Sequence, residues 1–359
     1  KYPKVGEKNS VVSVWIYDLE TKLSIKTDIG NDTDQYIPRI KWNKNGKLCI
    51  TRLNRLQNKL ELLLADASSG KTSVLFTESN KYYIDITDDL TFLNDNSFIW
   101  TSTMNGYNHI YHYAADGKFI KRITTGNWDV TTLYGLDEKK KLVYYQSAEV
   151  SPLSRAVYVI GLDGKNKKNI TSTTGTNSAE FNPTFTYFLR KHSSSNTPNE
   201  YFVCKSDGKE VRLLEDNKSL KDLRSKYKIS SRSFFNFTTK EGIILNGWIM
   251  KPLNFDSTKK YPVLMHVYGG PGDQQVLDMY MGNRDINLNY LCQQGYIIAC
   301  ADNRGSGARG EEFLKCTYLQ LGKLETEDQI SGARYLQTLP YVDANRIGII
   351  GWSYGGYMS

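Results

Sequence analysis

The sequence predicts a partial β-propeller of about four and a half blades, followed by the N-terminal part of an α/β-hydrolase domain. Three observations lead to this fold class. A turn motif recurs at a nearly constant interval in the first two thirds of the chain. Apolar strands then alternate with a helix-like segment, and a G-x-S-x-G motif follows the last of these strands.

The recurring turn is a tetrapeptide with glycine in its third position. It reads SSGK, ADGK, LDGK and SDGK, and its glycines, Gly70, Gly117, Gly164 and Gly208, are spaced by 47, 47 and 44 residues. Each turn separates two strand-like runs, as a hairpin turn does, and two further runs precede it. Four short strands per repeat are typical of propeller blades, because one blade cannot cover both of its own faces.

The first residues fit the same repeat. Residues 11–27, VVSVWIYDLETKLSIKT, resemble the second half of a blade with its turn at Glu20–Lys22. We therefore expect the chain to begin inside a blade.

A polar stretch marks the change of architecture. We assign residues 1–217 to the propeller, 218–232 to a linker and 233–359 to the α/β-hydrolase domain, which we expect to be truncated after the nucleophile elbow.

In this last part the runs YPVLMHV, GYIIACA and RIGIIG read as buried strands of a parallel sheet. Residues 324–339 have helical spacing. One side of this helix should carry Ile330, Ala333, Leu336 and Leu339.

The motif Gly351-Trp352-Ser353-Tyr354-Gly355 comes directly after RIGIIG. This is the pattern of a nucleophile elbow, a strand-to-helix turn so tight that side chains next to it would clash. Glycines therefore lie two positions before and two positions after the serine, and the serine oxygen stands above the sheet. The alternative is an ordinary serine in a strand-to-helix turn.

A glycine-rich loop, HVYGGPGD, spans residues 266–273 after the first buried strand. In an α/β-hydrolase the loop at this position contributes to the oxyanion hole. The alternative is a plain turn made by Gly-Gly-Pro-Gly.

Composition excludes several other classes of protein. The net charge of +8 gathers in short runs such as 139–141 and 165–168, which read as solvated turns, so we expect no nucleic-acid surface. No apolar run has the roughly 18 residues of a membrane span. The five cysteines are scattered, without a C-x-x-C pair, so we expect neither a zinc site nor a thioredoxin-like site. We also expect no other metal and no cofactor. They are Cys49, Cys204, Cys292, Cys300 and Cys316.

The chain contains four specific motifs: KKYPVLMHVYGGPG, DNRGSGARG, LETEDQI and GWSYGGYMS. Together they resemble the prolyl oligopeptidase family of serine peptidases, and within it the dipeptidyl peptidase IV branch. The resemblance covers essentially the whole chain, including MNGYNHIYHY and TGNWDV in the propeller. It implies a propeller over a hydrolase domain, peptide substrates with Pro or Ala at the second position, a homodimer, and a periplasmic or secreted location.

The resemblance also implies residue roles. Ser353 matches the nucleophile, while the backbone N–H of Tyr354 and the hydroxyl of Tyr268 match the two oxyanion donors. Arg304 and Asp328 lie in family motifs, and we interpret both as structural.

The triad acid and base are not expected in this chain. In α/β-hydrolases they follow the serine along the sequence, whereas all four histidines precede Ser353. They are His109, His112, His192 and His266. We therefore expect an internal portion of a longer enzyme, inactive by itself.

Three functions remain open. The first is a serine exopeptidase that releases X-Pro or X-Ala dipeptides through an acyl-enzyme. The second is an oligopeptidase or acylaminoacyl peptidase on the same scaffold. The third is a non-catalytic propeller-hydrolase binding protein. An acidic pair that binds the substrate amine would favour the first.

Overall fold

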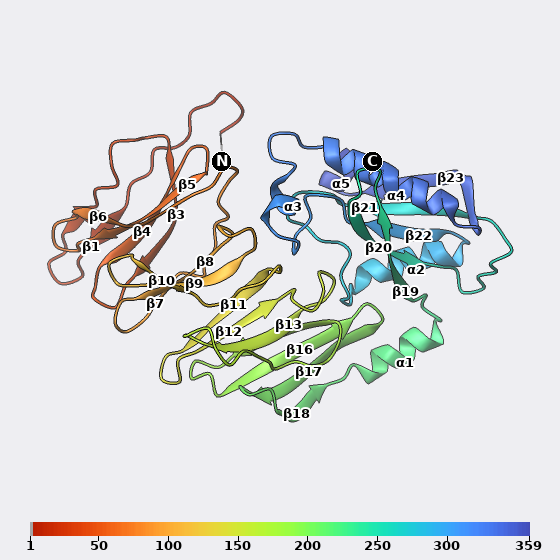
Figure 1. The fold of residues 1–359 in the computed structure, drawn as a ribbon, viewed down its shortest axis with the longest axis horizontal. Coiled ribbons are helices and arrows are strands. Elements are labelled where there is room, and N and C mark those ends of the chain that lie inside the picture. The colour runs from red at the N-terminus through yellow and green to blue at the C-terminus, as the bar shows by residue number, and fades with distance from the viewer. Residues whose placement is uncertain (1–2) are drawn as a thin grey trace. The chain divides into compact units, whose positions relative to one another are not determined.

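The computed structural model describes residues 3–359, apart from the side chains of residues 283–285. The chain divides into two compact units, one made of Lys1–Met104 and His109–Thr124, the other of Asn105–Asn108 and Thr125–Ser359. This division falls inside the predicted propeller and not at its end, so the domain bounds drawn from the sequence stay a prediction. Each unit contains sheets of its own (Figure 1).

The first unit holds a hairpin and two four-stranded antiparallel sheets. The hairpin is β1 (Trp15–Tyr17) with β2 (Ser24–Lys26), as predicted for residues 11–27. The first sheet is β3 (Gln35–Trp42), β4 (Leu48–Asn54), β5 (Lys59–Ala65) and β6 (Thr72–Ser79). The second is β7 (Thr91–Phe92), β8 (Phe98–Ser102), β9 (His109–Tyr113) and β10 (Phe119–Arg122).

The second unit begins with two more sheets of the same kind, each with its strands in chain order. One consists of β11 (Val130–Asp137), β12 (Leu142–Ser147), β13 (Ala156–Gly161) and β14 (Lys168–Asn169). The other consists of β15 (Thr176–Phe181), β16 (Tyr187–Ser194), β17 (Thr197–Lys205) and β18 (Glu210–Glu215). Within the described residues the propeller part thus has four four-stranded blades and one hairpin, which confirms the predicted four and a half.

Within each unit, apolar side chains fill the space between consecutive blades. One face of the β3–β6 sheet packs Leu60 and Leu62 against Phe98 and Tyr111 of the next sheet. Its other face joins a cluster with Ile16 of the β1–β2 hairpin. Since both faces of the sheet are covered by neighbours, the hydrophobic effect stabilises the stack of blades and not each blade alone.

The repeated glycines bring neighbouring blades together as well as turning the chain. Gly117 has φ 83°, and a Cβ there would lie 1.8 Å from the carbonyl oxygen of Leu75 in β6, the last strand of the preceding blade. No real Cβ can approach a carbonyl oxygen so closely. The same approach, at 2.2 and 2.6 Å, recurs for Gly70 with Lys26 and Gly208 with Ile170.

The expected linker contains a helix, α1 (Lys218–Lys226), before the last sheet begins. That sheet has the order β19-β20-β22-β21-β23. Its strands are β19 (Arg232–Thr238), β20 (Ile244–Met250), β21 (Tyr261–Val267), β22 (Ile297–Ala301) and β23 (Val342–Gly351). The first three in this order are antiparallel, and the last three run parallel, as the sequence predicted.

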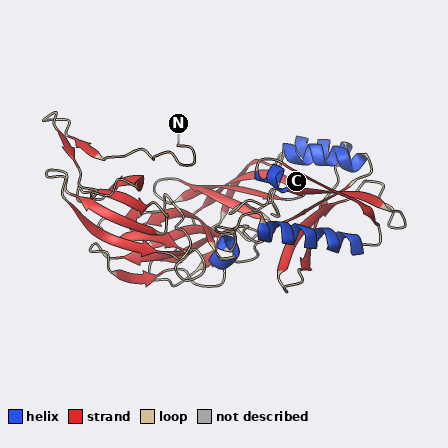
Figure 2. Ribbon diagram, turned by 90° about the horizontal axis from the view of Figure 1, so that it is seen from above, coloured by secondary structure: helices blue, strands red, loops and turns tan. Residues whose placement is uncertain are grey.

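Helices cover both faces of this sheet (Figure 2). α4 (Lys323–Thr338) packs Leu336 against the cluster with Val263 and Met265, while α2 (Asn283–Gln293) packs Leu288 against Trp248 on the other face. The remaining helices are the short α3 (Glu311–Lys315) and α5 (Tyr354–Met358). No described helix is both long and apolar enough to cross a membrane.

Two predictions about burial are wrong. Ile330 is 46% exposed, because the inner side of α4 is partly polar and carries Glu325, Asp328 and Gln329 instead. The run RIGIIG was predicted to be a buried strand, but most of β23 is exposed. The strand lies at the edge of the sheet, where β21 is its only neighbour among the described residues.

Candidate active site

Ser353 lies in the turn between β23 and α5. Its φ of 57° and ψ of −119° are rarely adopted by a residue with a side chain. Such strain persists only where the surrounding structure enforces it, and it is typical of functional sites. The Ser353 side chain is exposed, and Trp352 beside it is 87% exposed. The serine is therefore presented to solvent by a strained turn.

The flanking glycines allow this turn. A Cβ on Gly351 would lie 2.4 Å from the carbonyl carbon of Gly355 and 2.5 Å from the carbonyl oxygen of Val267. A Cβ on Gly355 would lie 2.2 Å from the same Val267 oxygen. A side chain at either glycine would therefore clash with neighbouring backbone, including the end of β21, as the G-x-S-x-G spacing predicted.

Tyr268 and Tyr354 meet beside the serine. Tyr268 directly follows Val267, whose register partner in β23 is Gly351, so both segments end at the same edge of the sheet. The two rings lie 6.2 Å apart at an angle of 45°, and both residues are half-buried. The structure therefore brings together the three predicted site residues.

Gly270 fits between these rings. A Cβ there would lie 2.7 Å from Cε1 of Tyr268 and 3.2 Å from Cγ of Tyr354. A larger residue would push the tyrosines apart.

The amide of Tyr354 is placed to serve as a donor. At the start of α5, Gly356 and Tyr357 donate their amides to the Ser353 carbonyl, at 2.9 and 3.1 Å. Within residues 3–359 the Tyr354 amide has no acceptor of its own. The first amides of a helix have no partner inside it, so this N–H can bind an oxyanion.

The loop after β22 holds the glycine-rich loop in place. The buried Asn303 amide donates to the Gly269 carbonyl at 3.1 Å, and Gly272 donates its N–H to the Gly305 carbonyl at 2.8 Å. These bonds fix the loop that carries Tyr268.

Asp302 fixes the next part of that loop. Its carboxylate accepts the amides of Gln275 and Val276 at 2.9 and 3.0 Å. Burial nevertheless raises the pKa of Asp302 from 3.8 to about 7, since a desolvated carboxylate is costly.

Arg304 and Asp328 join this loop to α4. The guanidinium donates to both oxygens of Asp328, with the shortest N–O distance 2.7 Å, and the Arg304 amide donates to Asp328 at 2.7 Å as well. The Asp328 side chain is 0% exposed. This pairing supports the structural role that we expected for both residues.

Sequence reasoning missed two polar residues that support the site. Asn303 lies inside DNRGSGARG and Glu325 inside LETEDQI, but nothing in their spacing marks a side chain that faces the elbow. Glu325 accepts the Tyr354 phenol at 2.8 Å. Its only signal in the sequence was an acidic residue near the start of the predicted helix.

All four histidines lie on strands. His109 and His112 belong to β9, His192 to β16 and His266 to β21. His192 contacts Glu200 and the Thr174 carbonyl through its two ring nitrogens, at 3.2 and 2.8 Å.

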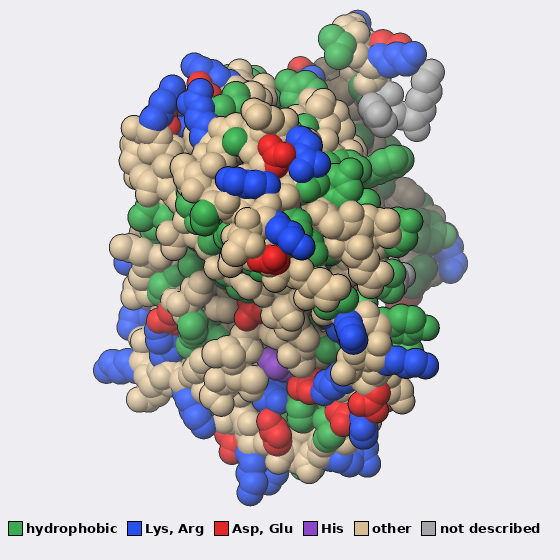
Figure 3. Space-filling model, turned by 90° about the vertical axis from the view of Figure 1, so that its right-hand side faces the viewer, with side chains coloured by type: hydrophobic (Ala, Val, Ile, Leu, Met, Phe, Trp, Pro, Cys, Tyr) green, Lys and Arg blue, Asp and Glu red, His purple; other side chains and the backbone are tan. Residues whose placement is uncertain are grey.

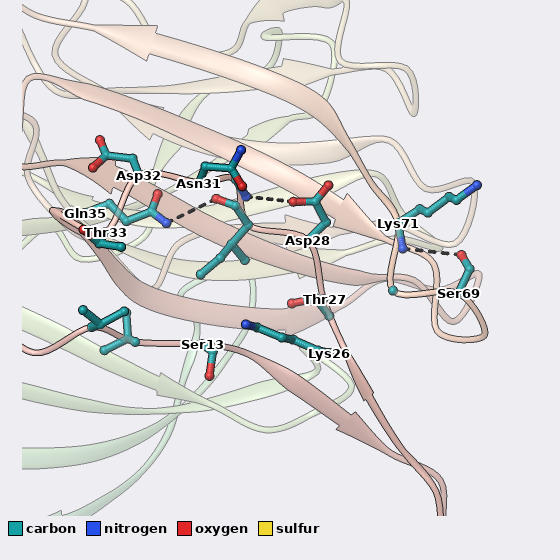
Figure 4. Close-up of a pocket in the computed structure, with 15 residues that line it drawn as sticks. Ser13, Lys26, Thr27, Asp28, Asn31, Asp32, Thr33, Gln35, Ser69 and Lys71 are labelled. Carbon is teal, nitrogen blue, oxygen red and sulfur yellow. Dashed lines mark hydrogen bonds between the residues drawn. The ribbon is translucent and has the colours of Figure 1, made fainter.

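Other parts of the described chain also contain cavities. In the first unit a cavity of about 490 Å³ lies between the β1–β2 hairpin and the first blade (Figure 4). Internal hydrogen bonds satisfy several of its polar groups: the Asp28 carboxylate accepts the Gly30 amide at 2.9 Å, and the Thr27 hydroxyl donates to the Val14 carbonyl at 3.0 Å. Among the residues that the structure describes, no three His, Cys, Asp or Glu side chains gather as metal ligands would. On the face drawn in Figure 3, basic and acidic side chains are intermixed.

Comparison with known proteins places these features in a family. Residues 1–199 match the family described as "Dipeptidyl peptidase IV (DPP IV) N-terminal region", and residues 283–359 match "Prolyl oligopeptidase family".

Among curated relatives, "Probable dipeptidyl-aminopeptidase B" of Arthroderma otae is 29% identical over 100% of the chain and 41% of its own length. "Probable dipeptidyl peptidase 4" of Emericella nidulans is 28% identical over 100% of the chain and 49% of its own. The chain spans about half the length of these relatives.

A solved structure agrees. The crystal structure of Porphyromonas gingivalis dipeptidyl peptidase 4 matches with a TM-score of 0.95 and 44% identity, over 100% of this chain and 51% of that one. The chain belongs to the dipeptidyl peptidase IV branch of the prolyl oligopeptidase family.

Proposed function

We propose that this chain carries the nucleophile and the oxyanion hole of a serine exopeptidase that releases X-Pro or X-Ala dipeptides from peptide amino termini. One observation carries the proposal: Ser353 stands exposed on a strained strand-to-helix turn, beside two half-buried tyrosines. The names of the relatives, dipeptidyl-aminopeptidase and dipeptidyl peptidase, supply the reaction class.

In the first half of the reaction, Ser353 Oγ forms a bond to the substrate carbonyl carbon as its proton passes to a general base, which in α/β-hydrolases follows the serine along the chain. The carbonyl oxygen becomes an oxyanion. It accepts hydrogen bonds from the Tyr354 amide and the Tyr268 hydroxyl, which stabilise it more than the ground state. The C–N bond then breaks, and the base returns the proton to the leaving amine.

In the second half, water attacks the acyl ester on Ser353 through the same oxyanion geometry. The base takes the water's proton and delivers it to the serine oxygen, which frees the dipeptide acid. The proposal requires that both donors stay fixed while charge develops. The hydrogen bonds from Asn303 and to Asp302, which hold the segment carrying Tyr268, support it.

The test uses the full-length protein with Gly-Pro-p-nitroanilide and its N-acetylated counterpart. We expect release of p-nitroaniline and the free dipeptide from the first substrate only, and no turnover after Ser353→Ala. Cleavage of the blocked substrate would instead indicate an oligopeptidase or acylaminoacyl peptidase. Absence of turnover with both substrates would indicate a non-catalytic binding protein.

A further inference from the structure

Glu325 is a buried carboxylate without a cation. Its residue is 0% exposed, and no Lys, Arg or His within the described residues pairs with it. Burying an unpaired carboxylate is costly unless hydrogen bonds replace its water. A fold that keeps such a group at the back of its proposed active site needs a physical reason for it.

The carboxylate is satisfied by two donors from different segments. Oε1 accepts the Tyr354 phenol at 2.8 Å, and Oε2 accepts the Gly322 amide at 3.0 Å. Glu325 also lies in the first turn of α4, where the helix dipole favours a negative charge. It therefore joins the amino end of α4 to the first residue of α5.

Tyr354 is held on its other sides by aromatic contacts. Its ring lies 6.2 Å from that of Tyr268 and meets that of Tyr357 edge-on at 5.4 Å. Burial, with the hydrogen bond to Glu325, raises the pKa of the Tyr354 phenol, so it remains a donor at any working pH.

The consequence lies in the backbone. The residue whose phenol is bound by Glu325 is also the residue whose amide is the proposed oxyanion donor, and its ring supports the other donor, Tyr268. We propose that Glu325 is a positioning residue, which fixes the Tyr354 amide and the Tyr268 hydroxyl in the oxyanion hole through its hydrogen bond to the Tyr354 phenol. This inference rests on the proposed function and adds to it the origin of the hole's rigidity.

Three variants of the full-length protein test it. Glu325→Ala and Tyr354→Phe each remove the bond, and each should lower kcat by about 10- to 100-fold, the scale for a misplaced catalytic group, with KM changed less than about twofold. Glu325→Gln should stay within about threefold of wild type. Its amide oxygen can accept from Gly322, and its NH2 can donate to the phenol oxygen.

The matched control is Glu327→Gln. Glu327 lies on the same helix, and its side chain is 39% exposed. It should have the wild-type kcat. The double variant Glu325→Gln/Tyr354→Phe should be no slower than Tyr354→Phe alone, since both changes act on one contact.

A readout specific to the oxyanion hole separates positioning from general structure. A boronic-acid analogue of a Pro dipeptide forms a tetrahedral adduct on serine, so its affinity should fall in Tyr354→Phe by the same factor as kcat, while product dipeptide affinity stays unchanged. If Glu325→Ala and Tyr354→Phe both keep the wild-type kcat and boronate affinity, the positioning role of Glu325 is overturned, while the proposed function stands. The same holds if the affinity for the product dipeptide falls as much as the affinity for the boronate. A wild-type protein that releases no dipeptide would overturn the proposed function and this inference with it. If Glu325→Ala does not fold, Tyr354→Phe decides.

Discussion

The blade turns and the proposed nucleophile elbow both need a glycine where two backbone segments come close, but the segments they join are separated by different lengths of chain. At each, a glycine lets backbone approach backbone: Gly117 against Leu75 in the propeller, and Gly355 against Val267 at the elbow. The blade contact joins segments about one repeat apart and recurs with the repeat. The elbow contact joins β21 to the turn after β23, far along the sequence, and occurs in one place. The contact between blades can be predicted from the sequence because its glycine recurs at a regular interval. The contact at the elbow can be predicted only from the G-x-S-x-G motif.

The two regions also differ in what supports them. Apolar side chains between sheets hold the blades together, as in the cluster with Leu60 and Phe98. The elbow and its glycine-rich loop are held by buried polar groups, including Asp302, Asn303 and Glu325. We therefore expect changes in the propeller to alter mainly stability, and changes near the elbow to alter mainly rate.

Among variants that keep Ser353, the largest effect should come from Tyr268→Phe. If its hydroxyl binds the oxyanion, removing it should lower kcat by roughly 10²- to 10³-fold with little change in KM, the scale for the loss of one oxyanion donor. Steady-state kinetics on a Gly-Pro substrate measure it. A rate within about twofold of wild type would mean that the Tyr268 ring only packs against Tyr354.

The next effect concerns the elbow glycines. Gly355→Ala places a Cβ 2.2 Å from the Val267 carbonyl oxygen, so the elbow must shift, and kcat should fall by about 100-fold. Gly356 is the control, because its nearest contact would be an ordinary 3.8 Å. Gly356→Ala should keep most of the activity. Equal rates for the two variants would show that the elbow tolerates the clash.

In the propeller the corresponding pair is Gly117→Ala and Gly46→Ala. Both glycines have positive φ, but a Cβ at Gly46 meets nothing within 4 Å. We expect Gly46→Ala to lower the free energy of unfolding by about 1 kcal/mol and Gly117→Ala by about 2–4 kcal/mol, with kcat of the folded protein unchanged in both. Urea denaturation measures the difference. Similar losses would mean that backbone strain alone, and not contact between blades, explains the repeated glycine.

A further effect is a dependence of stability on pH. The folded state raises the pKa of Asp302 from 3.8 to about 7, so it binds this proton more tightly than the unfolded state does. The contribution of Asp302 to the free energy of unfolding is fully present below about pH 4. It is lost as the pH rises to about 7, with a slope of up to about 1.4 kcal/mol per pH unit. Asp302→Asn should flatten this slope in urea denaturation at pH 5 and pH 7.

The control for that slope is Asp343→Asn. A hydrogen bond from Arg346 is the main cause that lowers the pKa of Asp343, so its contribution changes only below about pH 4. A slope that persists in Asp302→Asn would assign the pH dependence to another group.

These contrasts explain how far the sequence could predict the molecule. The blades, the hairpin at residues 11–27 and the order of the later strands follow from patterns within a few dozen residues. Ser353, Tyr268 and Tyr354 could be proposed as site residues because short motifs contain them, and the structure brings them together.

The errors and omissions arose where the partner is distant in sequence. Helical spacing placed Ile330 on the buried side of α4, but that side faces the loop after β22, whose polar groups need Asp328 and Gln329. Glu325 and Asn303 could not be assigned, because their partners, Tyr354 and Gly269, lie about 30 residues away on other elements.

If Ser353 is the nucleophile, it should react covalently with an active-site label. The full-length protein is treated with a fluorophosphonate probe, digested and mapped by mass spectrometry, beside Ser353→Ala. We expect one phosphonylated residue, Ser353 in GWSYGGYMS, with labelling and dipeptide release both lost in the variant. Label on a different residue, or unchanged labelling of Ser353→Ala, would contradict it.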